Sequence, residues 1–150
     1  MHSQNGKPRR RIVVRRSSIH GKGVFATTFI PADTRLIEYK GERRGAKSVD
    51  LEYGGQTHTF LFLLENEKEV IDANRGGNAA RWINHSCTPN CEPNEKNGRI
   101  FIDTIRDIYP GEELSFDYKL YLEERYTPSL KRLYACMCGT EQCRGTMLAR

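Results

Sequence analysis

Short apolar runs alternate with turn residues along most of the chain, and this pattern predicts a mainly β domain built from many short strands. Strands are expected at residues 12–14, 34–39, 59–64, 70–72, 99–105 and 114–118. Turns are expected at residues 21–23, 31–33, 65–68 and 109–112. The last turn holds Pro110 and Gly111 in the positions that a type II turn favours. No internal repeat interrupts this order, so a single domain is expected.

Two stretches depart from the strand pattern. Residues 42–57 are polar and contain glycines, with Leu51 and Tyr53 as their only large apolar anchors, which predicts an exposed insert with one helical turn. Residues 119–134 are typical of a helix or an ordered linker that is broken near Pro128.

The stretch from residue 78 to 91, NAARWINHSCTPNC, combines small, aromatic, polar and thiol side chains. Its first part can form one apolar-faced helical turn after two glycines. Asn84, His85 and Ser86 then favour turn conformations that expose polar groups. A helix end followed by an ordinary loop around Pro89 would explain any one of these residues. The complete string favours a short helix that delivers a functional polar loop.

Length and composition agree with one compact core, since the chain has 150 residues and is 37% hydrophobic. Its apolar runs are too short to span a bilayer, and its first residues lack the apolar core of a secretory signal, so we expect no membrane association and no export by that route. We take a monomer as the default.

The net charge of +5 is concentrated near the N-terminus. Residues 1–16 hold six of the 24 basic residues and no acidic one, which leaves 18 basic against 19 acidic residues in the rest. We assign residues 1–10 to a basic, disordered arm. A nuclear-import signal through KPRRR or a direct contact with nucleic acid are the alternatives.

The chain has five cysteines, and three of them cluster in the string CMCGTEQC near the C-terminus. The spacing of Cys136, Cys138 and Cys143 suits a metal better than nested disulfides. A closed structural zinc site needs four ligands. The cluster therefore predicts reduced thiols and one zinc ion with a further ligand from elsewhere in the chain.

Five strings of the chain together carry a resemblance to one protein family: RWINHSCTPNC, GEELSFDY, CxCx4C with the following CRGTM, HGKGVFA and LIEYKGE. Through them the chain resembles the SET-domain protein lysine methyltransferases of trithorax type. The resemblance implies a β-clip-type fold of small curved sheets, in which the C-terminal part of the domain threads past the NHS segment in a pseudoknot. It implies a SET domain at residues 11–119, and a linker with a post-SET zinc segment at 120–150. A cysteine-rich pre-SET region and a chromatin-reading module are missing, and the linker is long.

The same resemblance implies S-adenosylmethionine as cofactor. Its implied contacts are Lys22, Gly23, Tyr53, Arg81, Asn84 and His85. A zwitterionic methionine end needs a cation and an acceptor, and an adenine edge needs backbone hydrogen bonds. Without the resemblance, Arg81 would be assigned to a surface ion pair and Tyr53 to a loop.

For catalysis, the resemblance implies that the Tyr118 hydroxyl lies near the departing methyl group. Tyr39 and Phe116 would line the lysine channel, although by themselves they would be assigned to the core. In the family, a tyrosine two residues before the catalytic tyrosine holds a water that limits methylation. Phe116 lacks that hydroxyl, which implies a di- or trimethylated product. Asp117 is expected to be structural.

The resemblance takes the fourth zinc ligand from the cysteine after NHS, here Cys87, to complete the set with Cys136, Cys138 and Cys143. Cys91 is then a buried, inert thiol. Spacing alone leaves Cys91 open as the fourth ligand.

These inferences predict a lysine methyltransferase acting on a basic protein tail, most simply a histone. The alternatives are a catalytically silent SET-fold module that binds peptide, an enzyme for a non-histone protein, and a zinc-stabilised nucleic-acid-binding domain. The expected location is the nucleus, for a eukaryotic protein or a secreted effector that reaches a host nucleus, and otherwise the cytoplasm.

Overall fold

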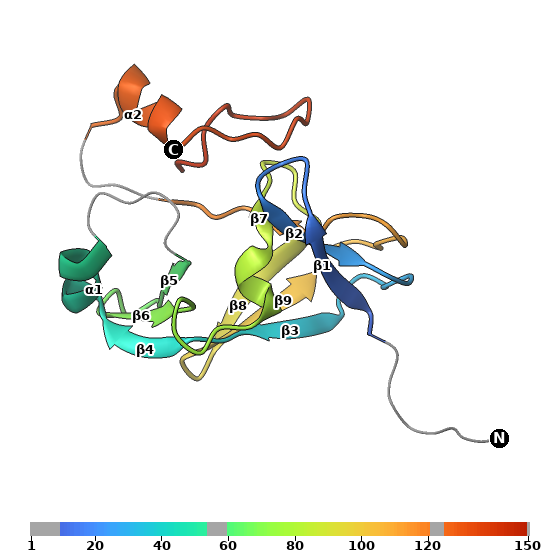
Figure 1. Cartoon of the computed structure of the whole chain (residues 1–150), viewed down its shortest axis with the longest axis horizontal. Coiled ribbons are helices and arrows are strands. Elements are labelled where there is room, and N and C mark those ends of the chain that lie inside the picture. The colour runs from blue at the N-terminus through green and yellow to red at the C-terminus, as the bar shows by residue number, and fades with distance from the viewer. Residues whose placement is uncertain (1–9, 54–59, 121–124, 150) are drawn as a thin grey trace.

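The computed structural model describes residues 10–53, 60–120 and 125–149. Within these ranges short strands predominate and form four small sheets, which confirms the expected mainly β architecture (Figure 1). The strands are β1 (Ile12–Arg16), β2 (Lys22–Ala26), β3 (Arg35–Tyr39), β4 (Glu42–Gly45), β5 (Leu61–Leu63), β6 (Glu69–Asp72), β7 (Asn84–His85), β8 (Cys91–Lys96), β9 (Arg99–Thr104) and β10 (Ser115–Phe116). The helices are α1 (Ala46–Tyr53), the 3-10 helix η1 (Ala79–Trp82) and α2 (Pro128–Leu133).

Three of the sheets are antiparallel. Strands β1 and β2 form a hairpin, β9 lies between β3 and β8, and β6 lies between β4 and β5. The fourth pairs β7 with β10 in parallel. This parallel contact lays the residues after η1 beside a segment that lies 31 positions later in the chain, as the implied crossing of the two segments requires.

Most of the predicted strands and turns are confirmed, but the turn predicted at residues 21–23 lies just before Lys22, because Lys22 and Gly23 begin strand β2 and pair with β1. The turn at residues 109–112 has a Glu112 N–H to Tyr109 carbonyl hydrogen bond of 3.1 Å and a φ of +90° at Gly111, a conformation that glycine adopts without strain. The predicted start of β5 at residue 59 lies outside the described residues.

The insert prediction was wrong in extent. Instead of one helical turn, residues 42–53 form β4 and the eight-residue helix α1. Strand β4 pairs with β6, and Val49 of α1 is almost fully buried. Most of residues 42–53 are exposed, as predicted, but four of the charged side chains, Glu42, Arg43, Arg44 and Glu52, make ion pairs. Arg44 pairs with the fully buried Asp72 at 3.0 Å.

Three further boundaries differ from the sequence prediction. Strand β8 was not predicted, because Pro93 and several charged residues conceal its alternation. Strand β10 has two residues instead of the predicted five. Pro128 starts α2 instead of breaking a helix, since its missing N–H is not needed in the first turn and Thr127 caps that turn.

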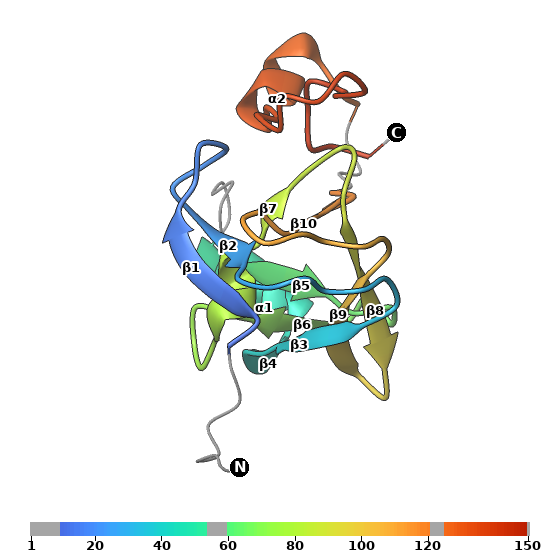
Figure 2. The same cartoon turned by 90° about the vertical axis from the view of Figure 1, so that its right-hand side faces the viewer.

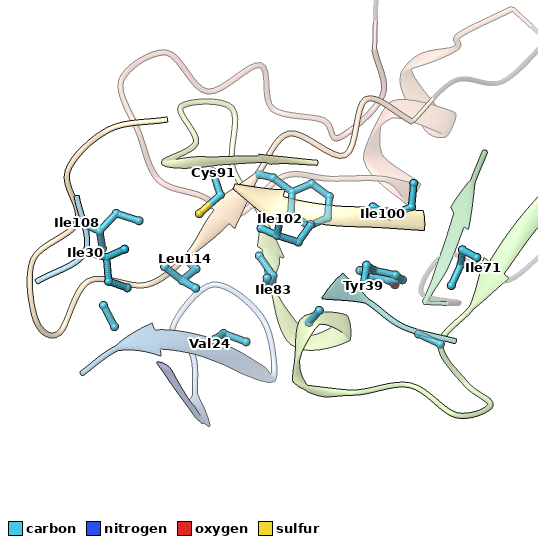
Figure 3. Packing of buried hydrophobic residues seen from close by; sticks show 14 of the residues in the cluster. Val24, Ile30, Tyr39, Ile71, Ile83, Cys91, Ile100, Ile102, Ile108 and Leu114 are labelled. Atoms are coloured by element: carbon cyan, nitrogen blue, oxygen red, sulfur yellow. The ribbon is translucent and has the colours of Figure 1, made fainter. Parts of the chain in front are cut away.

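The hydrophobic core lies where β2, β9 and the segment from η1 to β7 converge (Figure 3). Val24, Ile83, Ile102 and Leu114 meet there, each at most 1% exposed. Because Ile83 is held in this core, the polar residues that follow it have a fixed position.

The C-terminal segment at residues 125–149 packs at one end of the domain, beside the loop that follows β7 (Figures 1 and 2). A short bridge between Ala135 and Thr146 lies within this segment, and one between Leu120 and Leu148 joins its end to the residues that follow β10. Among the described helices, each is too short or too polar to cross a membrane.

Candidate functional site

The segment from Asn78 to Ser86 passes from the 3-10 helix η1 directly into strand β7. The Asn78 side chain accepts the Ala80 N–H and donates to the Glu38 carbonyl, which fixes the start of η1. Asn84 and His85 then pair with Ser115 and Phe116 of β10. The expectation of an exposed polar turn was therefore wrong. The backbone is extended, and both side chains are buried among neighbouring segments.

The Asn84 amide joins this segment to the β1–β2 hairpin. Its Nδ2, with two hydrogens to donate, faces three acceptors: the carbonyls of His20, at 3.2 Å, and Lys22, at 3.0 Å, and Glu113 Oε2, at 2.8 Å. A Cβ at Gly23 would lie 2.2 Å from Glu113 Oε2, so a larger residue here would displace that carboxylate from its present position. The structure thus brings Lys22, Gly23 and Asn84 together.

Arg81 and Lys22 both lie against Trp82. The Arg81 guanidinium carbon is 4.8 Å, and the Lys22 Nζ 4.9 Å, from the centre of the Trp82 ring. Arg81 Nη1 donates to the Ala73 carbonyl, but the buried Nε has no hydrogen-bond partner among the described residues. A buried cationic donor without an acceptor is costly. It fits a site for an anionic group such as the carboxylate of an amino acid.

Four aromatic residues, Tyr39, Phe62, Phe116 and Tyr118, form what we call the aromatic cluster. Ring centroids are 5.6 Å apart for Tyr39 and Phe62, 6.4 Å for Phe62 and Phe116, and 4.9 Å for Phe116 and Tyr118. Sequence reasoning missed Phe62. The signal available was its place on the inward face of a predicted hairpin strand, opposite Ile71.

Both tyrosines of the aromatic cluster are in a low-polarity environment. Burial is the main cause that raises the pKa of Tyr118 and of Tyr39 well above the ordinary value. The Tyr118 hydroxyl donates to the Ile83 carbonyl. Both hydroxyls are therefore neutral at physiological pH and can act as dipoles, not as bases.

His85 lies between Tyr118 and the thiols. Its Nδ1 accepts the backbone N–H of Tyr118 at 3.0 Å, and its Nε2 is 3.5 Å from Cys87 Sγ. Burial lowers the pKa of His85 to about 4, so the ring is neutral at pH 7. Since Nδ1 is an acceptor, the single proton belongs on Nε2, facing the sulfur.

The structure brings Cys87, Cys136, Cys138 and Cys143 together, with all four sulfurs within 4.8 Å of one another. The Cys87 and Cys136 sulfurs are 3.7 Å apart. Zinc–sulfur bonds of about 2.3 Å in a tetrahedron require sulfurs about 3.8 Å apart. These thiols could therefore hold one zinc ion.

Backbone donors also surround the four thiols. The N–H groups of Arg144, Gly145 and Cys138 point at the sulfurs of Cys87, Cys143 and Cys136, at 3.3 to 3.4 Å. Such donors favour the thiolate form that a metal needs. Cys91 lies apart in the hydrophobic core, where burial raises its pKa to about 12.

Asp117 connects the thiol-bearing segment to the catalytic candidate. Its carboxylate accepts two hydrogen bonds from the Arg144 guanidinium, at 2.7 and 3.2 Å. Asp117 directly precedes Tyr118, and Arg144 directly follows Cys143. This bidentate pair therefore fixes the C-terminal segment next to Tyr118.

Tyr53 is the one predicted site residue that the structure does not bring to the others. It lies on α1, and its hydroxyl donates to Asp72 at 3.1 Å. Within the described part of the chain, no hydrogen bond or ring contact links it to Lys22, Asn84 or His85.

Comparison with known proteins finds a matching family model and several relatives. Residues 21–119 match the family model described as SET domain. The histone-lysine N-methyltransferase, H3 lysine-4 specific, of Chaetomium globosum is 38% identical over 95% of this chain, and that of Emericella nidulans is 40% identical over 87%. Histone-lysine N-methyltransferase SETD1A of Homo sapiens is 38% identical over 88%. The matched part makes up only 14%, 11% and 8% of these relatives.

We expect one tightly bound zinc ion per chain, because four thiols converge within bonding geometry of one point. Metal analysis of the purified protein, combined with titration of free thiols, measures this. Strong chelation should release the zinc and abolish cofactor binding together, since Cys87 lies two residues after His85.

One variant tests the metal site and a second serves as its control. Cys138→Ser should lose the metal, and Cys91→Ala should keep it, because Cys91 lies in the core. Protein that contains no zinc and has all its cysteines titratable would contradict the metal site, and loss of zinc from Cys91→Ala would point to Cys91 as a ligand.

Proposed function

Because the chain belongs to the SET domain family, we propose that it is a protein lysine N-methyltransferase, which moves a methyl group from S-adenosylmethionine to a lysine ε-amine. The observation that carries this proposal is the junction at Ile83. Its carbonyl accepts the hydroxyl of Tyr118 at the end of the aromatic cluster, and the next residue, Asn84, begins the polar site. The aromatic cluster, which would contact an apolar stem, thus meets polar groups that would bind a charged amino-acid end.

The polar residues fit the proposed cofactor. The unpartnered Nε of Arg81 suits the methionine carboxylate, and the Asn84 amide suits the ammonium. The backbone at Lys22 and Gly23 allows a close approach, and the His85 backbone would meet the adenine edge. When bound, S-adenosylmethionine supplies an electrophilic methyl group on a positively charged sulfur. We keep Tyr53 as a candidate cofactor contact, although the insert would have to rearrange to bring it to the other site residues.

The aromatic cluster would prepare the lysine for attack. A lysine amine must be neutral to accept a methyl group, and at a reference pKa of about 10.4 this costs roughly 4.6 kcal/mol at pH 7. The apolar rings of Tyr39, Phe62 and Phe116 disfavour the ammonium by desolvation. A nearby positive charge acts in the same direction, so a strong general base is not required.

Tyr118 is our candidate for the catalytic residue. Its hydroxyl proton is directed to the Ile83 carbonyl, which leaves the oxygen lone pairs free to orient an amine and to stabilise developing positive charge. Its raised pKa keeps it neutral throughout the working pH range.

We propose a histone, and specifically the tail of histone H3, as substrate, because the related enzymes are named H3 lysine-4 specific. A nuclear location follows from that substrate. A catalytically silent peptide-binding module is the second candidate, but the combination of Asn84, His85 and Tyr118 at one junction favours an enzyme. The proposed arm lies almost wholly outside the described residues, and contact with nucleic acid through it stays a prediction.

Transfer of labelled methyl groups to histone H3 tests the function, and Tyr118→Phe tests the mechanism. Removal of the hydroxyl should lower the transfer rate by about 100-fold or more while cofactor affinity changes little, because the hydroxyl acts mainly at the transfer step. Tyr109→Phe removes a hydroxyl from an exposed ring and serves as the control. Equal turnover in Tyr118→Phe would remove Tyr118 from the mechanism, and a wild-type protein that binds histone peptide without transfer would support the silent module.

Activity at sub-saturating substrate should rise from pH 7 towards pH 9. The neutral fraction of the substrate lysine increases about tenfold per pH unit in this range. Tyr118 should not oppose the rise, because its raised pKa keeps its proton bound there. Initial rates in buffers of equal ionic strength measure the profile, and circular dichroism checks that the protein stays folded. A rate that falls above pH 7 in folded protein would contradict this account.

The product should carry two or three methyl groups. Phe116 is 4% exposed and has no hydroxyl to hold a water in the aromatic cluster, and a water needs at least two polar partners to stay ordered. Phe116→Tyr should therefore shift the product towards monomethyl-lysine. Mass spectrometry of a single-lysine peptide measures the distribution. Phe101→Tyr is the control, because the Phe101 ring contacts the guanidinium groups of Arg35 and Arg99 outside the cluster.

A wild-type enzyme that stops at one methyl group, or a Phe116→Tyr variant with an unchanged product, would show that Phe116 does not set the product. Tyr39 would then be the next residue to test, since it lies at the other end of the aromatic cluster.

A further inference from the structure

The direction of the Asn84 amide is determined by its surroundings. The atom assigned as Nδ2 faces three acceptors, the carbonyls of His20 and Lys22 and the carboxylate of Glu113. A flipped amide would place Oδ1 against three oxygens, which is strongly unfavourable. Oδ1 therefore points the other way, and it has no donor among the residues that the structure describes.

The closest of the three acceptors is the carboxylate, at 2.8 Å, and a charged acceptor makes the strongest of these bonds. Glu113 is itself rigidly placed. Its backbone lies next to β2 through a bridge with Phe25, and the Asn90 side chain donates to its carbonyl at 2.9 Å. The Ser17 hydroxyl is 2.8 Å from both carboxylate oxygens, which ties Glu113 to the loop of the β1–β2 hairpin.

Glu113 makes no ion pair within the described ranges of the chain. Its negative charge is therefore compensated only by hydrogen bonds, directly beside an amide whose free atom is an acceptor. Both features favour a cation at that position.

We propose that Glu113 is a positioning residue for cofactor binding. It locks the Asn84 amide with Oδ1 towards the site, so that Oδ1 accepts a hydrogen bond from the ammonium group of the methionine end, and its charge adds attraction for that ammonium. This inference rests on the proposed function of the same site. Gly23 contributes to this arrangement of Glu113 and Asn84, because its missing Cβ leaves room for the carboxylate beside the amide.

The substitution Glu113→Gln tests the proposal, since it keeps the shape and an acceptor and removes the charge. Isothermal titration should show S-adenosylhomocysteine, which carries the ammonium, binding about tenfold more weakly. Methylthioadenosine lacks the whole amino-acid end, and its affinity should stay within about twofold of the wild type. The matched control is Glu112→Gln, because Glu112 pairs with Arg106 and the Tyr109 N–H away from Asn84 and should leave both affinities unchanged.

A double-mutant cycle shows whether Glu113 acts through Asn84. In an Asn84→Ala background, Glu113→Gln should weaken binding of S-adenosylhomocysteine by less than about threefold, the remainder being the direct effect of the charge. Equal weakening of both ligands in Glu113→Gln would mean a merely structural role. An unchanged affinity of Glu113→Gln for S-adenosylhomocysteine would overturn the proposal. So would a double mutant in which the losses of the two single variants simply add. A wild-type protein that binds neither ligand would instead overturn the proposed function, and this inference with it.

Discussion

The candidate site depends on one contact, the parallel pairing of β7 with β10. Each strand has only two residues, so its hydrogen bonds alone would hold it weakly. Ile83 on one side and Leu114 on the other anchor the pair in the hydrophobic core. Because both anchors are buried directly before the paired residues, Asn84, His85 and the aromatic ring of Phe116 are held in place at a point where two distant segments meet. A rigid backbone at this point is what a site for group transfer requires.

The C-terminal segment contributes to this junction through a second set of contacts. The His85 ring joins the backbone of Tyr118 to the sulfur of Cys87, and Asp117 joins β10 to Arg144. A metal held by the four thiols would therefore act on the orientation of Tyr118 through neighbouring hydrogen bonds. The thiol cluster is thus linked to the catalytic candidate through contacts within hydrogen-bond range.

The polar and apolar halves of the site follow different physical rules. On the polar side, Asn84, Glu113 and the hairpin loop form hydrogen bonds with one another, and within the described residues the buried Arg81 Nε has no partner. On the apolar side, four rings pack against one another, and burial keeps both tyrosine hydroxyls neutral. A charged ligand end and an apolar side chain would each find the surroundings that suit them, with the reacting atoms between the two halves.

Much of this site could be predicted from local sequence. The strands at residues 12–14, 34–39 and 99–105 follow from alternating apolar residues, because the side chains of a strand point to opposite faces in turn. The four cysteines and the residues around NHS were recognisable because their chemical types are rare in combination and their order along the chain carries the resemblance to a family. These are properties of short segments, which do not depend on what packs against them.

Contacts between distant segments could not be predicted in the same way. Asn84 and His85 have side chains that favour turns, yet they form a strand because β10 offers the backbone partners. Phe62 joins the aromatic cluster, and Tyr53 is turned to Asp72, because of how the sheets are placed relative to one another. The sequence by itself determined which chemical groups the protein has and that its fold is built of short strands. Only the tertiary structure decided which of those groups meet, because burial and hydrogen-bond partners depend on residues that are far apart in the chain.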